Sequence, residues 1–110
     1  MEQELELVAE CWHTAFATTA TPSERQMLVW LDRYPLVIVE KALLKTGVKA
    51  MTMQRRSEPM SYVDRLRYAS AVMRNLQVAA EEYAAEVAEY EAAEREQESG
   101  AENSRGFSFA

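Results

Sequence analysis

Residues 21–45, TPSERQMLVWLDRYPLVIVEKALLK, decide the fold, because they predict two consecutive helices separated by a proline. Thr21 is expected to cap the first helix, with Pro22 at its first position. Glu24 follows the cap by three residues, which completes the arrangement of a capping box. This start signal is the sharpest local pattern in the chain.

The helix that follows Thr21 is predicted to be amphipathic. Its apolar side chains recur at helical spacing and are expected to face inward: Met27, Leu28, Trp30 and Leu31. Pro35 disfavours helical geometry in the residue before it. The helix is therefore expected to end near Arg33 or Tyr34.

Pro35 can itself open the next helix. The side chains expected to face the core from this helix are Val37, Ile38, Ala42 and either Leu43 or Leu44. Residues 37–39 could also form a strand, but a lone short strand would lack a partner elsewhere in the sequence, so we favour a helix. Gly47 is expected to end or loosen this helix, and residues 50–60, which include Pro59, predict a connection.

Helical patterns also occupy the two ends of the chain. Within residues 2–16, one face carries Leu5, Val8, Trp12 and either Ala15 or Phe16. Ser61 is a candidate cap, with Asp64 three residues later. Apolar residues then alternate in steps of four and three, the spacing of a helix-packing seam: Tyr62, Leu66, Ala69, Met73, Leu76, Ala80, Tyr83, Val87 and Tyr90.

The predicted fold is all-α: a compact domain of about four helices with a longer C-terminal helix and a disordered tail. The 110 residues include only 3 Gly and 3 Pro, too few for a turn-rich sandwich or barrel. The expected core positions are Leu5, Trp12, Phe16, Leu28, Leu31, Ile38, Ala42, Leu66, Val72 and Leu76.

Three regions are predicted along the chain: a helical domain at 1–78, an acidic helical extension at 79–98 and a disordered tail at 99–110. Gly100 is expected to stop the last helix. Phe107 and Phe109 near the end of the tail are interpreted either as a docking peptide or as an exposed terminus.

The sequence offers little for catalysis. It has one cysteine, Cys11, one histidine, His13, and no glycine-rich phosphate loop. Cys11 and His13 are two residues apart on a predicted helix and point to different sides, so no zinc site can be assembled from them. We therefore expect no catalytic residues, no metal and no cofactor, and we expect a cytoplasmic protein without a membrane span or signal peptide.

Charge is strongly segregated along the chain. Residues 21–78 carry ten Lys or Arg against five acids, whereas residues 79–102 carry nine Glu and one Arg. The acidic run is interpreted as a solvated face or as an internal competitor for the basic segment. The basic segment suits phosphate contacts, although it could also be an ordinary solvated surface. Its candidate DNA-binding residues are Lys41, Lys45, Lys49, Arg55, Arg56, Arg65, Arg67 and Arg74.

Residues 12–77 resemble the DnaD domain of bacterial and phage replication proteins. The resemblance rests on the Thr21-Pro22-Ser23-Glu24 helix start, Trp30, Val37-Ile38 with Ala42-Leu43, and a closing motif formed by Tyr68, Val72 and Leu76. In that family the last two motif positions are Ile and Trp, and the tail that binds DNA is not acidic as it is here.

The resemblance implies a helical, non-catalytic accessory protein of DNA replication. Such a protein would bind DNA without strong sequence preference and recruit replication-initiation or helicase-loading proteins, with Tyr68, Val72 and Leu76 as structural positions. Homo-oligomers are possible. The alternative is a helical adaptor without nucleic-acid binding, which would use the seam through Tyr83, Val87 and Tyr90 for a protein partner.

Overall fold

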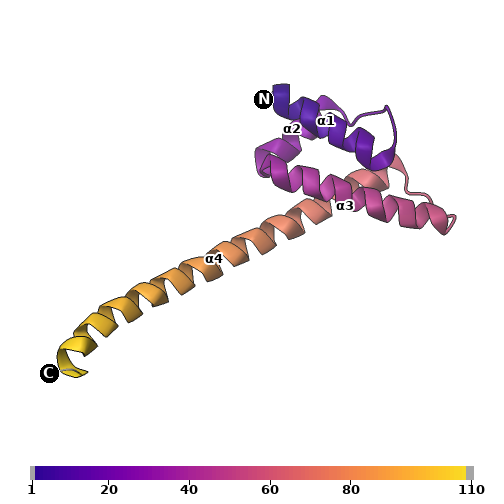
Figure 1. Cartoon of the computed structure of the whole chain (residues 1–110). Coiled ribbons are helices and arrows are strands. Elements are labelled where there is room, and N and C mark those ends of the chain that lie inside the picture. Colours follow the sequence, from indigo (N-terminus) through magenta and orange to yellow (C-terminus); the bar gives the residue numbers. More distant parts are fainter. Residues whose placement is uncertain (1, 109–110) are drawn as a thin grey trace. The chain divides into compact units, whose positions relative to one another are not determined.

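Figure 1 shows the computed structural model of the chain, which describes the secondary structure of residues 2–108 and the side chains of residues 2–98. Residues 2–108 form four helices and no strand: α1 (Glu2–Phe16), α2 (Glu24–Arg33), α3 (Leu36–Arg55) and α4 (Tyr62–Ser108). The predicted all-α fold with a long C-terminal helix is thus confirmed. The chain divides into two units, Met1–Gln77 and Val78–Ala110, one residue before the predicted boundary.

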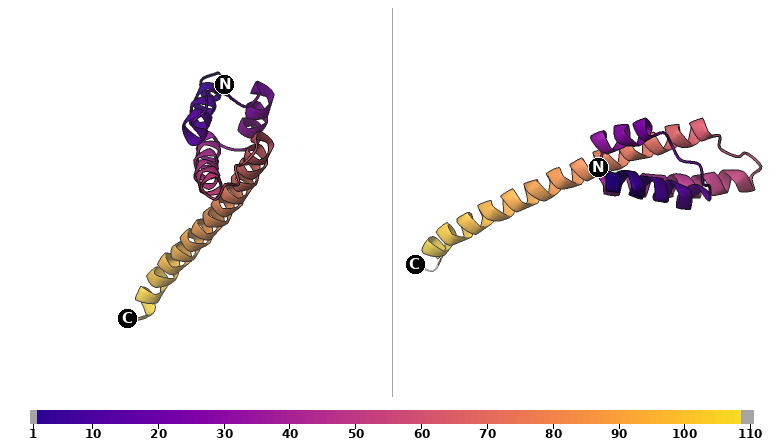
Figure 2. Two further views of the ribbon diagram at one scale, coloured as in Figure 1. Left: turned by 90° about the vertical axis from the view of Figure 1, so that its right-hand side faces the viewer. Right: turned by 90° about the horizontal axis from the view of Figure 1, so that it is seen from above.

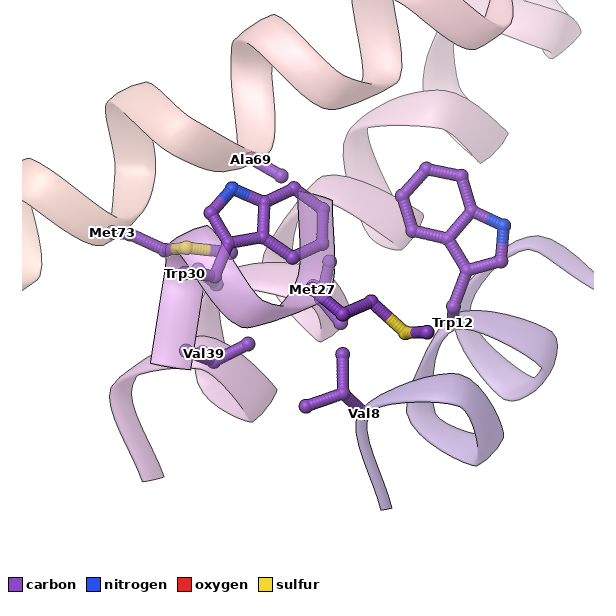
Figure 3. Packing of buried hydrophobic residues seen from close by; sticks show 9 residues of the cluster. Val8, Trp12, Met27, Trp30, Val39, Ala69 and Met73 are labelled. Carbon is purple, nitrogen blue, oxygen red and sulfur yellow. The ribbon is translucent and has the colours of Figure 1, made fainter. Parts of the chain in front are cut away.

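The core of the Met1–Gln77 unit takes side chains from all four helices. These are Val8 and Trp12 from α1, Met27 and Trp30 from α2, Val39, Ala42 and Leu43 from α3, and Ala69 and Met73 from α4. The two views of Figure 2 show α1 and α3 side by side. Figure 3 shows Trp30 beside Met73 and Ala69, with Met27 directed toward Val8 and Trp12.

Aromatic rings gather around Trp12. Its ring centroid lies 4.4 Å from that of Phe16, 6.3 Å from that of Trp30 and 5.8 Å from that of Tyr62. Such pairs add stabilisation beyond the area they bury, because the ring edges and faces carry opposite partial charges. Trp12 therefore connects α1 with both α2 and the start of α4.

The start of α2 differs from the predicted capping box. Ser23, and not Thr21, is the cap: its Oγ accepts a hydrogen bond from the backbone N–H of Gln26 at 3.1 Å. Pro22 precedes the cap and is buried, so it does not occupy the first helical position. A serine is as good a cap as a threonine, and the sequence contains both within three residues, which is why the pattern was ambiguous.

The expected end of α2 is confirmed. The helix ends at Arg33, and the N–H of Tyr34 still donates to the carbonyl of Trp30 at 2.8 Å. Pro35 then caps α3 through its carbonyl, which accepts from the N–H groups of Ile38 and Val39 at 3.0 and 3.2 Å. One proline thus ends one helix and begins the next.

Gly47 does not end or loosen a helix, contrary to the prediction. α3 continues through it to Arg55, so the predicted connection at 50–60 begins only at Arg56. A Cβ atom at Gly47 would lie 2.5 Å from the backbone carbonyl oxygen of Ala15 in α1. The glycine is a packing residue, because it allows the backbones of α1 and α3 to approach closely.

The predicted cap of the last helix is confirmed, since Ser61 Oγ accepts from the N–H of Asp64 at 3.1 Å. The buried face of α4 is centred on Ala69 and Met73, while Val72 and Leu76 pack against the core only in part. Tyr68, the first position of the family motif, is 37% exposed and lies outside the core, unlike the structural position expected for it.

The other expected core positions are likewise either buried or half-buried. Trp12 and Ala42 are buried, and the remainder are half-buried, namely Leu5, Phe16, Leu28, Leu31, Ile38 and Leu66. Helical spacing identified the buried side of most helices, but the most deeply buried residue is often the neighbour of the expected one, and on α3 the expected core residue Val37 is exposed.

In the Val78–Ala110 unit, α4 continues past Gly100 to Ser108, so the predicted helix stop at Gly100 is wrong. Between residues 79 and 98 every side chain is exposed except the half-buried Val87. The predicted disorder of 99–110 stays a prediction, and the side chains of Phe107 and Phe109 lie outside the described residues.

Replacement of Gly47 by Ala tests the close approach of α1 and α3. In an unobstructed helix, Gly→Ala stabilises by about 1 kcal/mol. Here the new methyl group would meet the Ala15 carbonyl, so we expect Gly47→Ala to lower the free energy of unfolding by about 1–3 kcal/mol. Urea denaturation followed by circular dichroism measures the change.

Gln54→Ala, an exposed change on the same helix, is the control and should shift stability by no more than about 0.5 kcal/mol. A Gly47→Ala protein as stable as the original, or more stable, would contradict the packing role of this glycine.

Candidate functional site

The eight predicted DNA-binding cations are divided between α3 with its C-cap and α4. Three lie on α3, with Lys41 and Lys45 exposed and Lys49 half-buried. Arg55 is the last residue of α3 and Arg56 is its C-cap, both exposed. The remaining three, Arg65, Arg67 and Arg74, lie on α4.

Arg74 lines a groove that sequence reasoning missed. Its walls are formed by the end of α2 and the middle of the core part of α4, and it encloses about 290 Å³ between Arg33, Tyr34, Ser70, Ala71 and Arg74. We call it the α2–α4 groove. It brings together two arginines that are 41 positions apart in the sequence.

The position of each wall has a local cause. Arg33 is the last residue of α2 because Pro35 prevents the helix from continuing. Ser70 and Arg74 are four residues apart on α4 and therefore share one face of that helix. The two walls are joined by a hydrogen bond of 3.0 Å, in which Trp30 Nε1 donates to Ser70 Oγ.

The groove presents hydrogen-bond donors. Arg33 and Arg74 carry exposed guanidinium groups, each with five N–H donors. Neither forms an ion pair within the part of the chain whose side chains are described. Ser70 Oγ already accepts from Trp30, so its hydroxyl hydrogen is available to a ligand. Paired guanidinium groups with a hydroxyl suit a phosphate or a carboxylate.

Arg65 is placed differently from the other cations. Its guanidinium carbon lies 4.8 Å from the centroid of the Phe16 ring, a cation–π contact between α4 and α1. Its Nε is buried and has no hydrogen-bond partner. The structure therefore gives Arg65 a packing contact, whereas Arg67 and Arg74 are exposed on α4.

The lysines of α3 lie among exposed apolar side chains. Four apolar residues on this helix are about half exposed or more: Val37 at 66%, Leu44 at 49%, Val48 at 66% and Met51 at 54%. We call these four residues the α3 outer row. The helical spacing predicts Val37, and either Leu43 or Leu44, on the core side, whereas Val37 and Leu44 are exposed in the structure.

Cys11 and His13, whose side-chain types often take part in catalysis, are both partly buried in this structure. The Cys11 thiol is half-buried and donates to the backbone oxygen of Glu40 at 3.5 Å. Burial, together with the negative charge of Glu40, raises the pKa of Cys11 from its usual 9.0 to about 11. His13 Nε2 is buried without a hydrogen-bond partner. The described residues contain no group of three His, Cys, Asp or Glu side chains that could hold a metal ion.

Comparison with protein-family models, with curated proteins and with solved structures gives no match to this chain. In the described part of the chain, none of the helices has an apolar stretch long enough to cross a bilayer.

The sequence predicts where each arginine of the groove lies on its helix, but it does not predict that the two arginines line one groove. Pro35 predicts that Arg33 stands at a helix end, and the helical pattern predicts that Arg74 is exposed. Nothing in the spacing indicates that these two positions meet, because their proximity depends on how α2 packs against α4.

The raised pKa of Cys11 predicts that its thiol reacts slowly with alkylating reagents. Only the thiolate reacts with iodoacetamide, and a shift from 9.0 to about 11 lowers its fraction at pH 8 about 100-fold. We expect alkylation at pH 8 to be slow in the folded protein and to accelerate when urea unfolds it. Mass spectrometry of the labelled chain over time provides the measurement, and equal rates in the two states would show that the thiol is neither buried nor shifted.

Proposed function

We propose that this chain is a non-catalytic accessory protein of DNA replication, similar to DnaD, that binds DNA through its phosphates and recruits initiation or helicase-loading proteins. The observation that carries the DNA-binding part is the α2–α4 groove, where Arg33 and Arg74 stand beside the Ser70 hydroxyl. The protein would be cytoplasmic, from a bacterium or a phage.

The groove supports binding to the phosphate backbone of DNA and not to its bases. Phosphate contacts fix the position of a protein on DNA but carry no sequence information. Arg67 precedes Arg74 by seven residues, two helical turns, and extends the same exposed face of α4. The cations of α3 and of the following connection remain candidate contacts for neighbouring phosphates. A protein of this kind would bind many sequences with similar affinity.

The replication part of the proposal rests on the motif resemblance. Val72 and Leu76 pack against the core, as structural motif positions should. Ser23 caps α2 inside the Thr21-Pro22-Ser23-Glu24 start, and Trp30 is buried. These residues support a shared helical scaffold, and the partner proteins are proposed from the resemblance alone.

A helical adaptor without nucleic-acid binding is the second candidate. The observation that favours it is the α3 outer row, whose exposed apolar residues are typical of a protein contact surface. The two candidates differ in the surface used, since the adaptor needs no cation in the α2–α4 groove.

A titration of labelled DNA followed by fluorescence anisotropy separates the candidates. We expect the full chain to bind duplex and single-stranded DNA at low salt, and the affinity to fall steeply as salt rises, because bound cations release counterions from DNA. Absence of binding at low salt would reject the DNA-binding proposal and favour the adaptor.

The double variant Arg33→Gln, Arg74→Gln locates the contact. If each arginine neutralises one phosphate, the slope of log affinity against log salt should decrease by about 0.9 for each lost contact with duplex DNA. Affinity at low salt should fall with it.

The matched control is Arg25→Gln with Arg95→Gln, which removes two exposed cations outside the groove. If the control loses as much affinity as the groove variant, the groove has no special role, and binding would reflect only total charge.

A further inference from the structure

The outer face of α3 is apolar although its inner face already fills the core. Val39, Ala42 and Leu43 are buried against the other helices, whereas the α3 outer row lies on the opposite side in water. Surface helices normally carry charged or polar residues opposite the core, and a helix that is apolar on both sides is typical of a covered helix. α3 therefore has a face without a partner in the Met1–Gln77 unit.

The α3 outer row has the spacing of a helix-packing seam. Lys41 and Arg55 complete its alternation, so that positions 37, 41, 44, 48, 51 and 55 follow steps of four and three. This repeat is the one by which two helices pack along each other. The surface on α3 is thus shaped for another helix.

A second unpartnered seam lies on the α4 extension, which we define as residues 79–98. Ala80, Tyr83, Val87 and Tyr90 follow steps of three and four. Tyr83 and Tyr90 are each 69% exposed, and Val87 is half-buried. We call these four residues the extension row. Tyrosines are favoured at interfaces, because the ring buries area while the hydroxyl stays hydrated.

The two seams have opposite charges beside them. From residue 41 to residue 56 the chain has five cations and no acid, whereas the α4 extension has eight Glu and one Arg. Two extensions packed together would place glutamates against glutamates, and two α3 faces would place lysines against lysines. Only pairing of the α3 outer row with the extension row puts opposite charges beside a shared apolar seam.

The extension row is shorter than the α3 outer row and can lie along it. At 1.5 Å per residue, the α3 outer row spans about 21 Å and the extension row about 15 Å. The sequence has no Pro or Gly between Pro59 and Gly100, and residues 62–108 are assigned to one helix. We take a second copy as the occupant of the α3 outer row, and a mixing experiment distinguishes it from contact within one chain.

We propose that the chain self-associates, with the α4 extension of one copy packed along the α3 outer row of a second copy. Each copy carries both surfaces, so two copies in a two-fold arrangement can exchange the contact reciprocally. The lysines of α3 in one copy then lie against the acidic α4 extension of the other. This inference goes beyond the proposed function and involves no DNA.

Sedimentation equilibrium of the full chain, without DNA, measures the association. We expect the mass to rise with concentration toward at least twice the 12.5 kDa of one chain, and added salt to weaken the association. A mass of one chain at all concentrations would overturn the proposal.

Two charge-reversed variants provide the decisive test. One is Lys41→Glu, Lys45→Glu, Lys49→Glu, and the other is Glu86→Lys, Glu91→Lys, Glu94→Lys. In each variant alone the two seams carry like charges, so we expect the dissociation constant to rise about tenfold or more. In an equal mixture, each α3 meets an extension of opposite charge, and association should return.

Failure of the mixture to associate would overturn the proposal, because a second copy would then not be the occupant. Recovery on mixing also excludes folding back within one chain, which cannot be rescued by another molecule. Circular dichroism of each variant establishes that the helices are retained.

Two controls match the substitutions. Glu2→Lys, Glu4→Lys, Glu6→Lys reverses three exposed charges on α1 and should leave the association unchanged. Val48→Asp in the α3 outer row should weaken the association, whereas Val63→Asp, at an exposed valine of α4 outside both rows, should not. Equal losses for the two valine variants would overturn the assignment of the surface.

Discussion

The burial of Trp30 is the interaction on which the rest of the Met1–Gln77 unit depends. Its indole is almost completely buried, in contact with the core, and its Nε1–H donates to Ser70 Oγ of α4. A buried N–H without an acceptor would cost about 1–3 kcal/mol, so the serine is needed for the tryptophan to be buried at this position. This bond ties α2 to α4, and it thereby sets Arg33 beside Arg74 in the groove.

A second constraint acts between α1 and α3. Gly47 allows the Ala15 carbonyl to lie where a side chain would otherwise begin, and the neighbouring inner positions of α3 are also small, Ala42, Thr46 and Ala50. Thr46 satisfies its buried hydroxyl by donating to the Ala42 carbonyl at 2.7 Å. The opposite side of α3 carries the exposed α3 outer row.

The cations of the chain are divided between two different surfaces, the α2–α4 groove and the α3 outer row. The α2–α4 groove places two arginines beside the Ser70 hydroxyl and the Tyr34 ring, and its guanidinium groups suit an anion. The α3 outer row combines lysines with valine, leucine and methionine, which suits a helix of opposite charge. Both proposed contacts are sensitive to salt, but the observation behind DNA binding is the Arg33 and Arg74 groove, whereas self-association uses the lysines of α3, so each proposal has its own test. The acidic extension has a partner of complementary charge within the same sequence.

The sequence by itself determined the class of the fold. The spacing of Val8 and Trp12, the proline that separates α2 from α3, and the Ser61 cap depend on contacts within one or two helical turns, and local patterns record such contacts. The same patterns identified most of the buried positions, with α3 as the exception. They did not decide between Thr21 and Ser23 as the cap of α2, since either hydroxyl can accept the same bond.

Only the tertiary structure decided what depends on distant partners. Gly47 looked like a helix end because a glycine destabilises an isolated helix, and only the Ala15 backbone explains why it stands in the middle of α3. Val37 and Leu44 had the periodicity of core residues, yet α1 and α2 cover the other side of their helix. The meeting of Arg33 with Arg74 depends on the Trp30–Ser70 bond across 40 positions. Helical periodicity identifies the faces of a helix, but which face is covered is set by the helices that pack against it.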